Sequence, residues 1–563
     1  MAANPGTDGD KTTSRAMPRP STAIRASLLW TPLLSIAAAA FAVEVPFFFR
    51  GTPSGHDIEF HLYTWLEVLA QWSHGILYPR WASLAHFAYG EPRFIFYPPA
   101  SWTLGAAIAA IFPWALAPGI YIWIALVAAG ASMFLLARQW FDRRDAACAA
   151  IFYAINPYHL LIIYWRSAFA ELLASSLLPL LLLLLLRGIT IRRNILLLAA
   201  LLAAAWLINA PAAVMIHYSL ALFVISLWWR RRSSALVLAP AIAVALGAAL
   251  AAFYLVPAIY EQKWVNIAES VSAGSRPADN FLFAHTSDPE HDTFNRLVSF
   301  VAAGQIVALT YLAWASRKQK FSAIRTSLSA WAAACILLML PVSGIFWNLL
   351  PKLQFMQFPW RWLLCLNVPL TLFLTAGLQK WMPRIAIYLS MVCVLILAGR
   401  HFQPPWWDSA DDLREMKENI TTGAGYEGTD EYAPLGADPS VIDKSARRVT
   451  VDGPAHAAIH VLDWQAESKT FTAQMSAGDR LALRLFNYPA WRVAVNGRPI
   501  KPSTREDTGR MLIPVEAGMN RVELRFVRTW DRALGAWISL LAVFLAIILW
   551  RLPTTGLTRE TDT

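Results

Sequence analysis

Apolar runs of membrane-spanning length recur along almost the whole chain, from Leu28 nearly to the C-terminus. Each run holds about 16 to 23 residues, long enough or nearly long enough for a helix to cross a bilayer. Hydrophobic residues make up 57% of the chain and charged residues only 15%, which excludes an ordinary soluble globular protein. The sequence therefore predicts an α-helical polytopic membrane protein.

We expect about twelve transmembrane helices. The first run, residues 27–49, is too long for the apolar part of a signal peptide and shows no small-residue cleavage site, so it is expected to remain as an anchor. The other candidate spans are residues 119–137, 146–163, 172–186, 195–209, 212–228, 235–256, 296–315, 327–345, 361–378, 384–399 and 533–551. A further run, 100–116, would break the parity of the topology if it crossed, so we expect it to be short or re-entrant.

The positive charge lies largely in short loops between apolar runs, such as 138–144, 187–193 and 380–384. The positive-inside rule places such loops in the cytoplasm. The net charge of +11 is therefore no sign of a nucleic-acid partner. We expect a multi-pass protein of the bacterial inner membrane, with the intervening loops on the outer face and disordered cytoplasmic tails at residues 1–26 and 552–563.

The composition changes beyond residue 400, where the transmembrane domain of residues 27–400 ends. We expect an irregular extracytoplasmic linker over residues 401–446. Seven segments of alternating apolar and polar residues follow within 447–530, and the Asn496 and Gly497 pair is a hairpin signal. This pattern predicts an antiparallel β-sandwich on the outer face. A last helix, residues 531–551, returns the chain to the cytoplasm.

The first outer loop, defined here as residues 50–99, collects acid, histidine and arginine where lipid meets water. From Ile58 its apolar residues recur at helical spacing with tryptophans among them, and Glu67 and Gln71 fall on the other side. The pattern is typical of an amphipathic helix lying in the membrane interface.

Asp57 and Glu59 are the candidate catalytic residues of this loop. A carboxylate at a membrane edge can act as general base, because partial burial and neighbouring groups tune its pKa. The alternative is structural, since Asp57 stands just before the helix and suits an N-cap. A metal site built from His56, Asp57, Glu59 and His61 is a further hypothesis.

Basic residues at the expected outer membrane edge form the second candidate group: Arg80, Arg93, Arg166, Lys352 and Arg361. Basic side chains there can hold a lipid-linked phosphate or diphosphate. For any one of them snorkelling or pairing with an acid is the simpler interpretation, and Arg166 has Glu171 nearby in sequence. As a set they favour an anionic ligand.

Several stretches together carry a family resemblance. GHDIEFHLYTW, YPRW, GEPRFIFYPPASW, QFPWRW and GYEGTDEYAP resemble the bacterial membrane proteins that carry the domain called 6-pyruvoyl-tetrahydropterin synthase related, although nothing here resembles a pterin enzyme or its zinc site. The block NYPAWRVAVNGRPI, with IPVEAGMNRVELRF and the final span, is similar to the C-terminus of YfhO-like membrane glycosyltransferases. Both groups look like members of the GT-C class, and the resemblance covers most of residues 27–551.

The resemblance implies a GT-C-like transferase that moves a sugar from a polyprenyl-phosphate-linked donor to a glycan, lipid or protein acceptor of the envelope. In that class an acid of the first outer loop is the catalytic base, which corresponds to Asp57, with Glu59 as the fallback. The residues expected to bind substrate or phosphate are His56, His61, Arg80, Glu91, Arg93, Arg166, Glu171 and Arg361. Many GT-C enzymes bind a divalent cation, Mg²⁺ or Mn²⁺, through outer-loop acids such as Asp57 and Glu59, and others do not. The next outer loop offers only Glu171.

Two other functions fit the same pattern. A lipid or glycan transporter predicts ionisable residues deep in the spans, whereas here they cluster at span ends. A non-catalytic envelope assembly factor would use the β-sandwich and keep the helices as an anchor.

Overall fold

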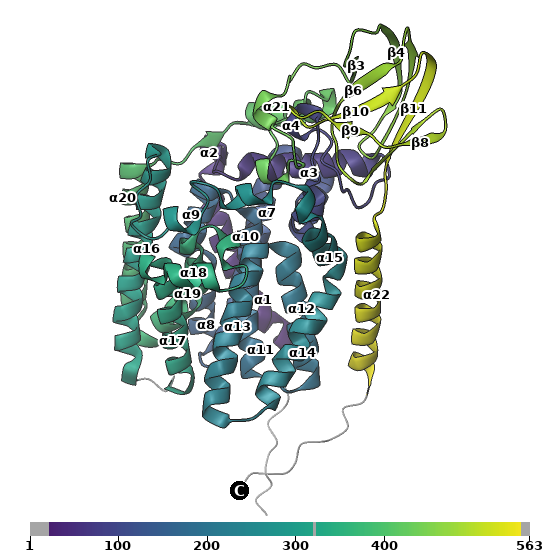
Figure 1. The fold of residues 1–563 in the computed structure, drawn as a ribbon. Helices are drawn as coiled ribbons and strands as arrows, with labels where there is room; N and C mark the ends of the chain where they lie inside the picture. The colour runs from purple at the N-terminus through teal and green to yellow at the C-terminus, as the bar shows by residue number, and fades with distance from the viewer. Residues whose placement is uncertain (1–21, 319–321, 553–563) are drawn as a thin grey trace, which may run out of the picture.

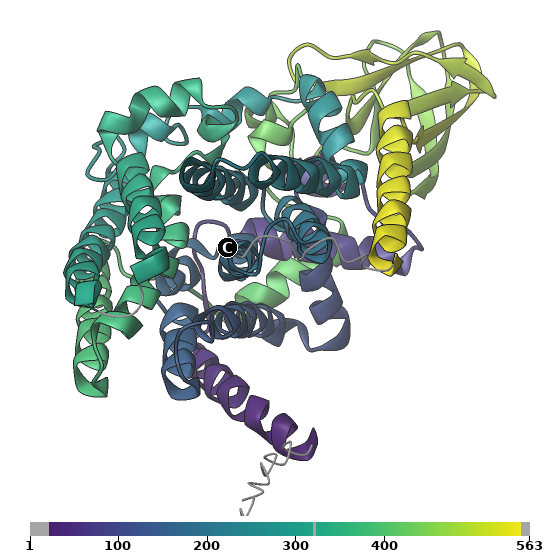
Figure 2. The ribbon, with the colours of Figure 1, turned by 90° about the horizontal axis from the view of Figure 1, so that it is seen from below.

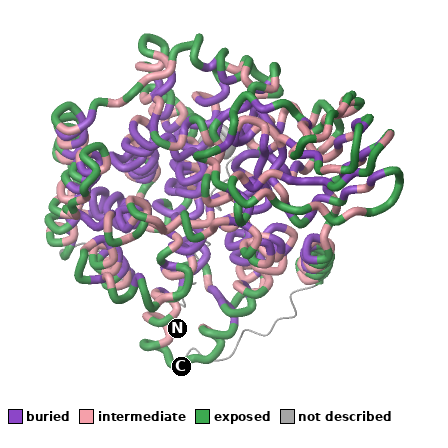
Figure 3. The backbone as a smooth tube through the Cα atoms, turned by 45° about the horizontal axis from the view of Figure 1, so that its top comes forward, coloured by how far each residue is buried: buried purple, intermediate pink, exposed green. Residues whose placement is uncertain are grey.

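The computed structural model describes residues 22–318 and 322–552 and consists of a helical bundle with a β domain at one end (Figure 1). The expected tails lie outside these residues for the most part, but helix α1 (Thr22–Glu44) already begins within the segment expected to be disordered. The bundle interior is buried and its periphery is exposed (Figure 3). Large apolar side chains are among the exposed residues, as lipid contact requires.

Each of the twelve expected spans contains a helix. Their bounds are α1, α7 (Ala117–Ala137), α8 (Arg143–Ala154), α11 (Leu177–Leu186), α12 (Arg192–Ile208), α13 (Ala210–Arg231), α14 (Ala235–Leu250), α16 (Pro289–Ala315), α17 (Ser322–Met339), α19 (Leu363–Gly377), α20 (Trp381–Phe402) and α22 (Trp530–Arg551). Among the described residues, eight helices are long and apolar enough to cross a membrane alone, or ten if two pairs bent by 77° and 91° each count as one span. Helices α12 and α19 fall short because they hold only 17 and 15 residues.

The run 100–116 forms a short helix, α6 (Pro99–Ile111), of 13 residues. A helix of that length rises about 20 Å, less than the roughly 30 Å of a hydrocarbon core. The structure thus agrees with the expectation of a short segment at this point. Helix α22 stands at one edge of the bundle beside the β domain, and α1 leaves the bundle at another edge (Figure 2).

The helix of the first outer loop, α3 (Ile58–Ser73), is buried on its polar side as well as its apolar side. It packs against α6 and against α21 (Ala410–Thr422). The carboxylate of Glu67 accepts hydrogen bonds from the backbone N–H of Ser83, over 3.0 Å, and from Gln71 Nε2, over 3.0 Å. The polar side of this helix is therefore covered by the following loop, which its hydrogen bonds hold in place.

The segment 401–446, expected to be an irregular linker, contains ordered elements. Strand β2 (Trp407–Asp408) pairs with β1 (Thr52–Pro53), and α21 begins with a capping box in which Ser409 and Asp412 satisfy each other's backbone N–H groups. Helix α21 ends at Gly423, whose φ of 74° lies in the left-handed region. Ser409 and Asp412 are a capping signal in the sequence, but the Gly-rich stretch that follows the helix favoured the prediction of an irregular segment.

The β domain consists of two antiparallel sheets. Their orders are β3-β6-β10-β9 and β4-β5-β11-β7-β8. The strands are β3 (Val449–Val451), β4 (Ala457–Trp464), β5 (Ser468–Met475), β6 (Asp479–Phe486), β7 (Trp491–Val495), β8 (Arg498–Ile500), β9 (Ser503–Thr504), β10 (Arg510–Val515) and β11 (Gly518–Phe526). The seven predicted strands are all present, and β8 and β9 are the short additions. Asn496 and Gly497, both at positive φ, form the predicted hairpin turn between β7 and β8.

The β domain packs directly on the first outer loop. Trp81 is fully buried, with its ring 5.7 Å from the ring of Trp491 and 5.5 Å from that of Phe526. Tyr89 packs on Phe486 in the same way, at 5.3 Å. One apolar core therefore joins loop and domain, which fixes the β domain relative to the loop.

Candidate functional site

A cavity of about 500 Å³ opens among loops at the end of the bundle that carries the β domain. The ionisable side chains that line it come from separate stretches of the chain: Asp57, His61, Arg166, Glu171, Arg361 and Glu431. Five of these six were candidates from the sequence. The fold thus gathers residues up to several hundred positions apart around one space.

Asp57 occupies the N-cap position of α3, but its side chain makes no capping hydrogen bond. Its Oδ2 instead accepts a hydrogen bond from Nη2 of Arg166 over 2.8 Å. The backbone N–H of Asp57 donates to the carbonyl of the same arginine over 2.9 Å. The Asp57 side chain remains 35% exposed, so the carboxylate is held on one side and faces the cavity with its free surface.

Arg166 ends a short π-helical turn, Ile162–Arg166, and the next residue, Ser167, is left-handed with φ of 48°. Its guanidinium lies 4.9 Å from the ring centre of Phe358 and 5.1 Å from that of Trp360, two rings that stack on each other. Gly55 packs so tightly on this turn that a Cβ there would lie 2.5 Å from the carbonyl carbon of Arg166. The turn and the first outer loop are therefore fitted to each other through backbone contact.

A second ion pair lies in the same cavity. Nε of Arg361 is 3.2 Å from Oε2 of Glu171, and Oε1 of that carboxylate accepts a hydrogen bond from the Tyr158 hydroxyl over 2.6 Å. Arg361 also donates to the carbonyl of Met356 over 2.7 Å. Arg166 and Glu171, whose closeness in sequence allowed a pair, do not pair with each other, because Arg166 pairs with Asp57 and Glu171 with Arg361.

The charges of the cavity set its protonation states. Burial would raise the pKa of Asp57, but Arg166, His61 and Arg361 outweigh it and hold the pKa below its ordinary value. Burial lowers the pKa of His61 to about 4, so its ring is neutral at neutral pH. Burial raises the pKa of Glu431 to about 7, helped by the nearby Glu91. The cavity thus presents an ionised carboxylate and two arginines to any bound molecule.

Glu91 and Arg93 lie outside the cavity lining, contrary to the prediction that they bind substrate. Both are fully buried, with Arg93 Nε 2.5 Å from Glu91 Oε1 and the Nε2 of His86 2.9 Å from Glu91 Oε2. Arg93 touches the cavity lining through Thr429, whose hydroxyl lies 3.3 Å from its Nη2, and through Phe60, whose ring centre lies 4.4 Å from its guanidinium carbon. This arginine is paired inside the protein and lies outside the cavity lining.

The remaining candidates lie elsewhere as well. Arg80 faces the β domain, where its backbone N–H donates to Glu467 over 3.1 Å. The ring of His56 packs on Phe294 at 4.6 Å, and Glu59 does not line the cavity. Lys352 lies with its Nζ 4.9 Å from the ring of Phe355.

The expected divalent-cation site does not fit the geometry of these residues. Asp57 is engaged by an arginine, and Glu59 lies outside the cavity lining. Within the described ranges no group of three or more histidine, cysteine, aspartate or glutamate side chains is arranged to hold a metal ion. We therefore derive no step through a metal.

Residues 429–432 are the part of the site that sequence reasoning missed. Thr429, Glu431 and Tyr432 line the cavity although they belong to the segment expected to be a linker. The family motif GYEGTDEYAP contains these residues and could have indicated them, but none of its residues was predicted to belong to the site.

The structure is that of a multi-pass membrane protein with a C-terminal antiparallel β domain before its last helix, as the sequence predicted. Residues 94–403 match the family model described as the 6-pyruvoyl-tetrahydropterin synthase related domain, a membrane protein. The match covers more than half of the chain. The chain therefore belongs to this family, which confirms the resemblance read from its motifs.

Solved structures similar to the chain are glycosyltransferases. The arabinofuranosyltransferase AftD from Mycobacteria is 16% identical with a TM-score of 0.40, over 71% of this chain and 27% of AftD. The oligosaccharyltransferase of Archaeoglobus fulgidus is 14% identical with a TM-score of 0.43, over 72% of this chain and 61% of that one. The same archaeal enzyme, AglB, in complex with an inhibitory peptide and a dolichol-phosphate gives a TM-score of 0.41 at 14% identity, over 74% and 62%. No curated protein sequence matches this chain significantly.

Proposed function

We propose that this protein is an inverting membrane glycosyltransferase that moves a sugar from a polyprenyl-phosphate-linked donor to an envelope acceptor on the outer face of the bacterial inner membrane. The observation that carries the proposal is Asp57: its carboxylate is fixed by Arg166 at 2.8 Å yet 35% exposed, at the wall of a 500 Å³ cavity that holds a second arginine. The family resemblance of the surrounding motifs supports the same reaction.

In this reaction the oxygen of an acceptor hydroxyl forms a bond to the anomeric carbon of the donor sugar. The bond from that carbon to the phosphate oxygen breaks, and the polyprenyl phosphate leaves with the electron pair. Asp57 takes the hydroxyl proton. Because Arg166 lowers the pKa of Asp57, the carboxylate is ionised at neutral pH and ready to accept that proton.

Arg361 is the residue proposed to stabilise the leaving phosphate. Arginine binds phosphate oxygens through paired N–H donors, and such fixed charges act most strongly where water is excluded. The Arg361 side chain is largely buried and lines the same cavity as Asp57. Its partner Glu171 positions the guanidinium, since it holds Nε at 3.2 Å.

The test is mass spectrometry of envelope glycans and lipid-linked sugars from strains that carry the wild-type protein, a deletion, or Asp57→Asn at matched protein level. We expect the deletion and Asp57→Asn to lose the same glycan modification while its lipid-linked donor accumulates. Glu516→Gln, at an exposed carboxylate of the β domain, is the matched control and is expected to behave as wild type. Full rescue of the deletion by Asp57→Asn would overturn the proposal in favour of transport or assembly.

A further inference from the structure

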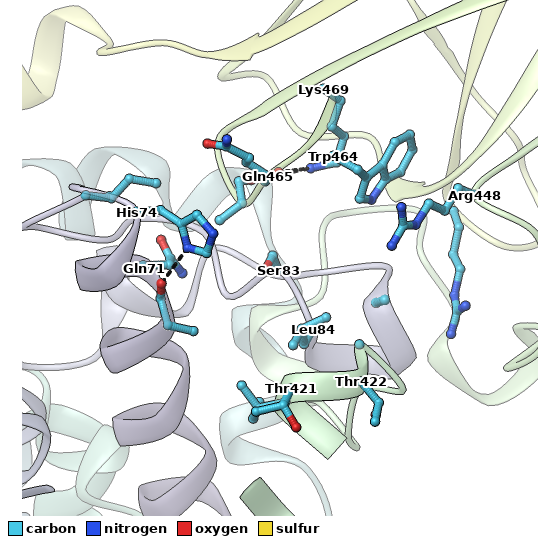
Figure 4. Close-up of a pocket in the computed structure, with 17 residues that line it drawn as sticks. Gln71, His74, Ser83, Leu84, Thr421, Thr422, Arg448, Trp464, Gln465 and Lys469 are labelled. Atoms are coloured by element: carbon cyan, nitrogen blue, oxygen red, sulfur yellow. Dashed lines mark hydrogen bonds between the residues drawn. The ribbon is translucent and has the colours of Figure 1, made fainter. Parts of the chain in front are cut away.

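A second pocket, of about 270 Å³, lies between the first outer loop, the end of α21 and the β domain (Figure 4). Its wall carries three cationic side chains, Arg448, Lys469 and Arg484, together with Trp464. Among residues 22–318 and 322–552, no aspartate or glutamate lines it. A pocket of this kind has an excess of positive charge, which favours an anionic ligand.

Lys469 projects from β5 into the junction and is only 2% exposed. Its Nζ donates to the carbonyl of Gln465 over 2.8 Å and lies 5.2 Å from the ring of Trp464. Among the described residues no carboxylate lies within ion-pair distance of it. Burial lowers the pKa of Lys469 to about 7, although the nearby carboxylates of Asp463, Glu67 and Glu467 favour its charged form, and an anion in the pocket would favour that form further.

The two arginines differ in how they are engaged. Arg484 donates to the backbone carbonyls of Phe87, over 2.8 Å, and Lys444, over 2.9 Å, so it ties the loop to the β domain. Arg448 is exposed and its guanidinium lies 5.8 Å from the centre of the Trp464 ring. In the part of the chain that the structure describes, its N–H groups have no hydrogen-bond acceptor. Arg448 is therefore the donor that remains available to a ligand.

Gln71 adds an unused acceptor on the opposite wall. Its Nε2 donates to Glu67 over 3.0 Å and to the carbonyl of Trp81 over 2.9 Å, which fixes the orientation of the amide. Its Oε1 is buried and has no partner among the described residues. Buried polar atoms are nearly always hydrogen-bonded, so this oxygen points to a donor such as a sugar hydroxyl.

From these contacts we propose that the pocket binds an anionic saccharide, with its carboxylate or phosphate on Arg448, its ring against Trp464 and a hydroxyl on Gln71. Gln71 lies fourteen residues along α3 from Asp57, a rise of about 21 Å. The pocket is thus a separate site from the cavity of Asp57. If the protein is a transferase as proposed above, the saccharide bound here is the end of the acceptor that lies away from the reacting hydroxyl. The binding of an anionic saccharide to this pocket does not depend on that proposal.

The test is isothermal titration calorimetry on the full-length protein in nanodiscs. The probes are tetragalacturonate, a galactotetraose that carries one phosphate, neutral galactotetraose, and inorganic phosphate. We expect at least one anionic tetrasaccharide to bind about tenfold or more tightly than the neutral one, with an affinity that falls as salt rises. Whichever of the two anionic tetrasaccharides binds more tightly identifies the acidic group of the ligand as a carboxylate or a phosphate.

Variants locate the site. Arg448→Gln is expected to weaken binding of the anionic probe about tenfold, as loss of a charge-assisted hydrogen bond predicts. Arg498→Gln removes the same charge from an exposed position on β8 and is expected to change little. Asp57→Asn is expected to bind normally, so failure of the transferase proposal leaves this result intact. Equal binding of the neutral tetrasaccharide, equally tight binding of inorganic phosphate alone, or equal effects of Arg448→Gln and Arg498→Gln would each overturn the proposal.

Discussion

Nη2 of Arg166 lies 2.8 Å from Oδ2 of Asp57, although the two residues are 109 positions apart. A backbone bond of 2.9 Å from the Asp57 N–H to the Arg166 carbonyl runs beside it. The π-helical turn that ends at Arg166 therefore sets both the position and the charge state of the carboxylate. Such turns are rare and often mark functional sites.

Arg166→Gln tests this coupling. Removal of the guanidinium lets the pKa of Asp57 rise from its lowered value, so the acid limb of the pH–activity profile should move to higher pH. We expect kcat/KM at neutral pH to fall about 100-fold or more, since Asp57 loses its positioning partner. The measurement is turnover of the lipid-linked donor across pH, with Arg166→Lys as the control that keeps the charge. An acid limb that stays in place in Arg166→Gln would contradict the assignment of Asp57 as the base.

His61 makes stability depend on pH. Its folded pKa is lowered to about 4 by burial, whereas the unfolded chain titrates near 6.5. The unfolded state therefore binds a proton that the folded state does not, and stability is lost as pH falls from 6.5 towards 4. Between pH 7 and pH 5 the loss is about 2 kcal/mol. In nanodiscs, Tm should fall over this interval by less in His61→Gln than in wild type, and an equal fall in both would show that His61 is protonated in the folded protein.

Glu91 should prove structural and not substrate-binding. Glu91→Ala leaves the buried Arg93 without its counter-charge, at a cost of about 3–5 kcal/mol. Glu523→Ala breaks a pair of similar geometry, 2.9 Å to Arg521, but on the surface, and should cost less than about 1 kcal/mol. Tm of the two variants in nanodiscs decides the point. A Glu91→Ala protein as stable as Glu523→Ala, yet inactive, would restore a substrate role for this pair.

The sequence predicted the helices and strands better than it predicted the contacts between them. Apolar run length gave the helices, and alternation with Asn496 and Gly497 gave the β domain, because both signals are local. The burial of the polar side of α3 could not be predicted from the sequence, because amphipathic spacing shows which face is polar and not what covers it. Glu67 faces a loop that closes over it.

The candidate site was predicted in part for the same reason. Membrane-edge acids and arginines were recognised as a group, and Asp57, His61, Arg166, Glu171 and Arg361 do share one cavity. Sequence spacing could not predict which residues of the group pair with each other. Glu171 is five residues from Arg166, but it pairs with the guanidinium of Arg361, which is 190 residues away. All three of Arg93, Arg166 and Arg361 are paired with a carboxylate, and only the fold shows that Arg166 and Arg361 line the cavity whereas Arg93 does not.

Gly105 provides the last prediction, on the packing that supports the site. In α6 it lies against α3, and a Cβ added there would overlap the indole of Trp65, which is fully buried. Gly105→Ala should therefore shift Trp65 and cost about 1–3 kcal/mol, in spite of the better helix propensity of alanine. Gly304→Ala in α16 is the matched control, because its new Cβ meets only Val394 at 3.4 Å and should be neutral or slightly stabilising. Thermal unfolding in nanodiscs separates the two. Because Asp57 is the N-cap residue of α3, Gly105→Ala should also reduce turnover, and a fully active, equally stable variant would show that α3 tolerates displacement without moving the carboxylate.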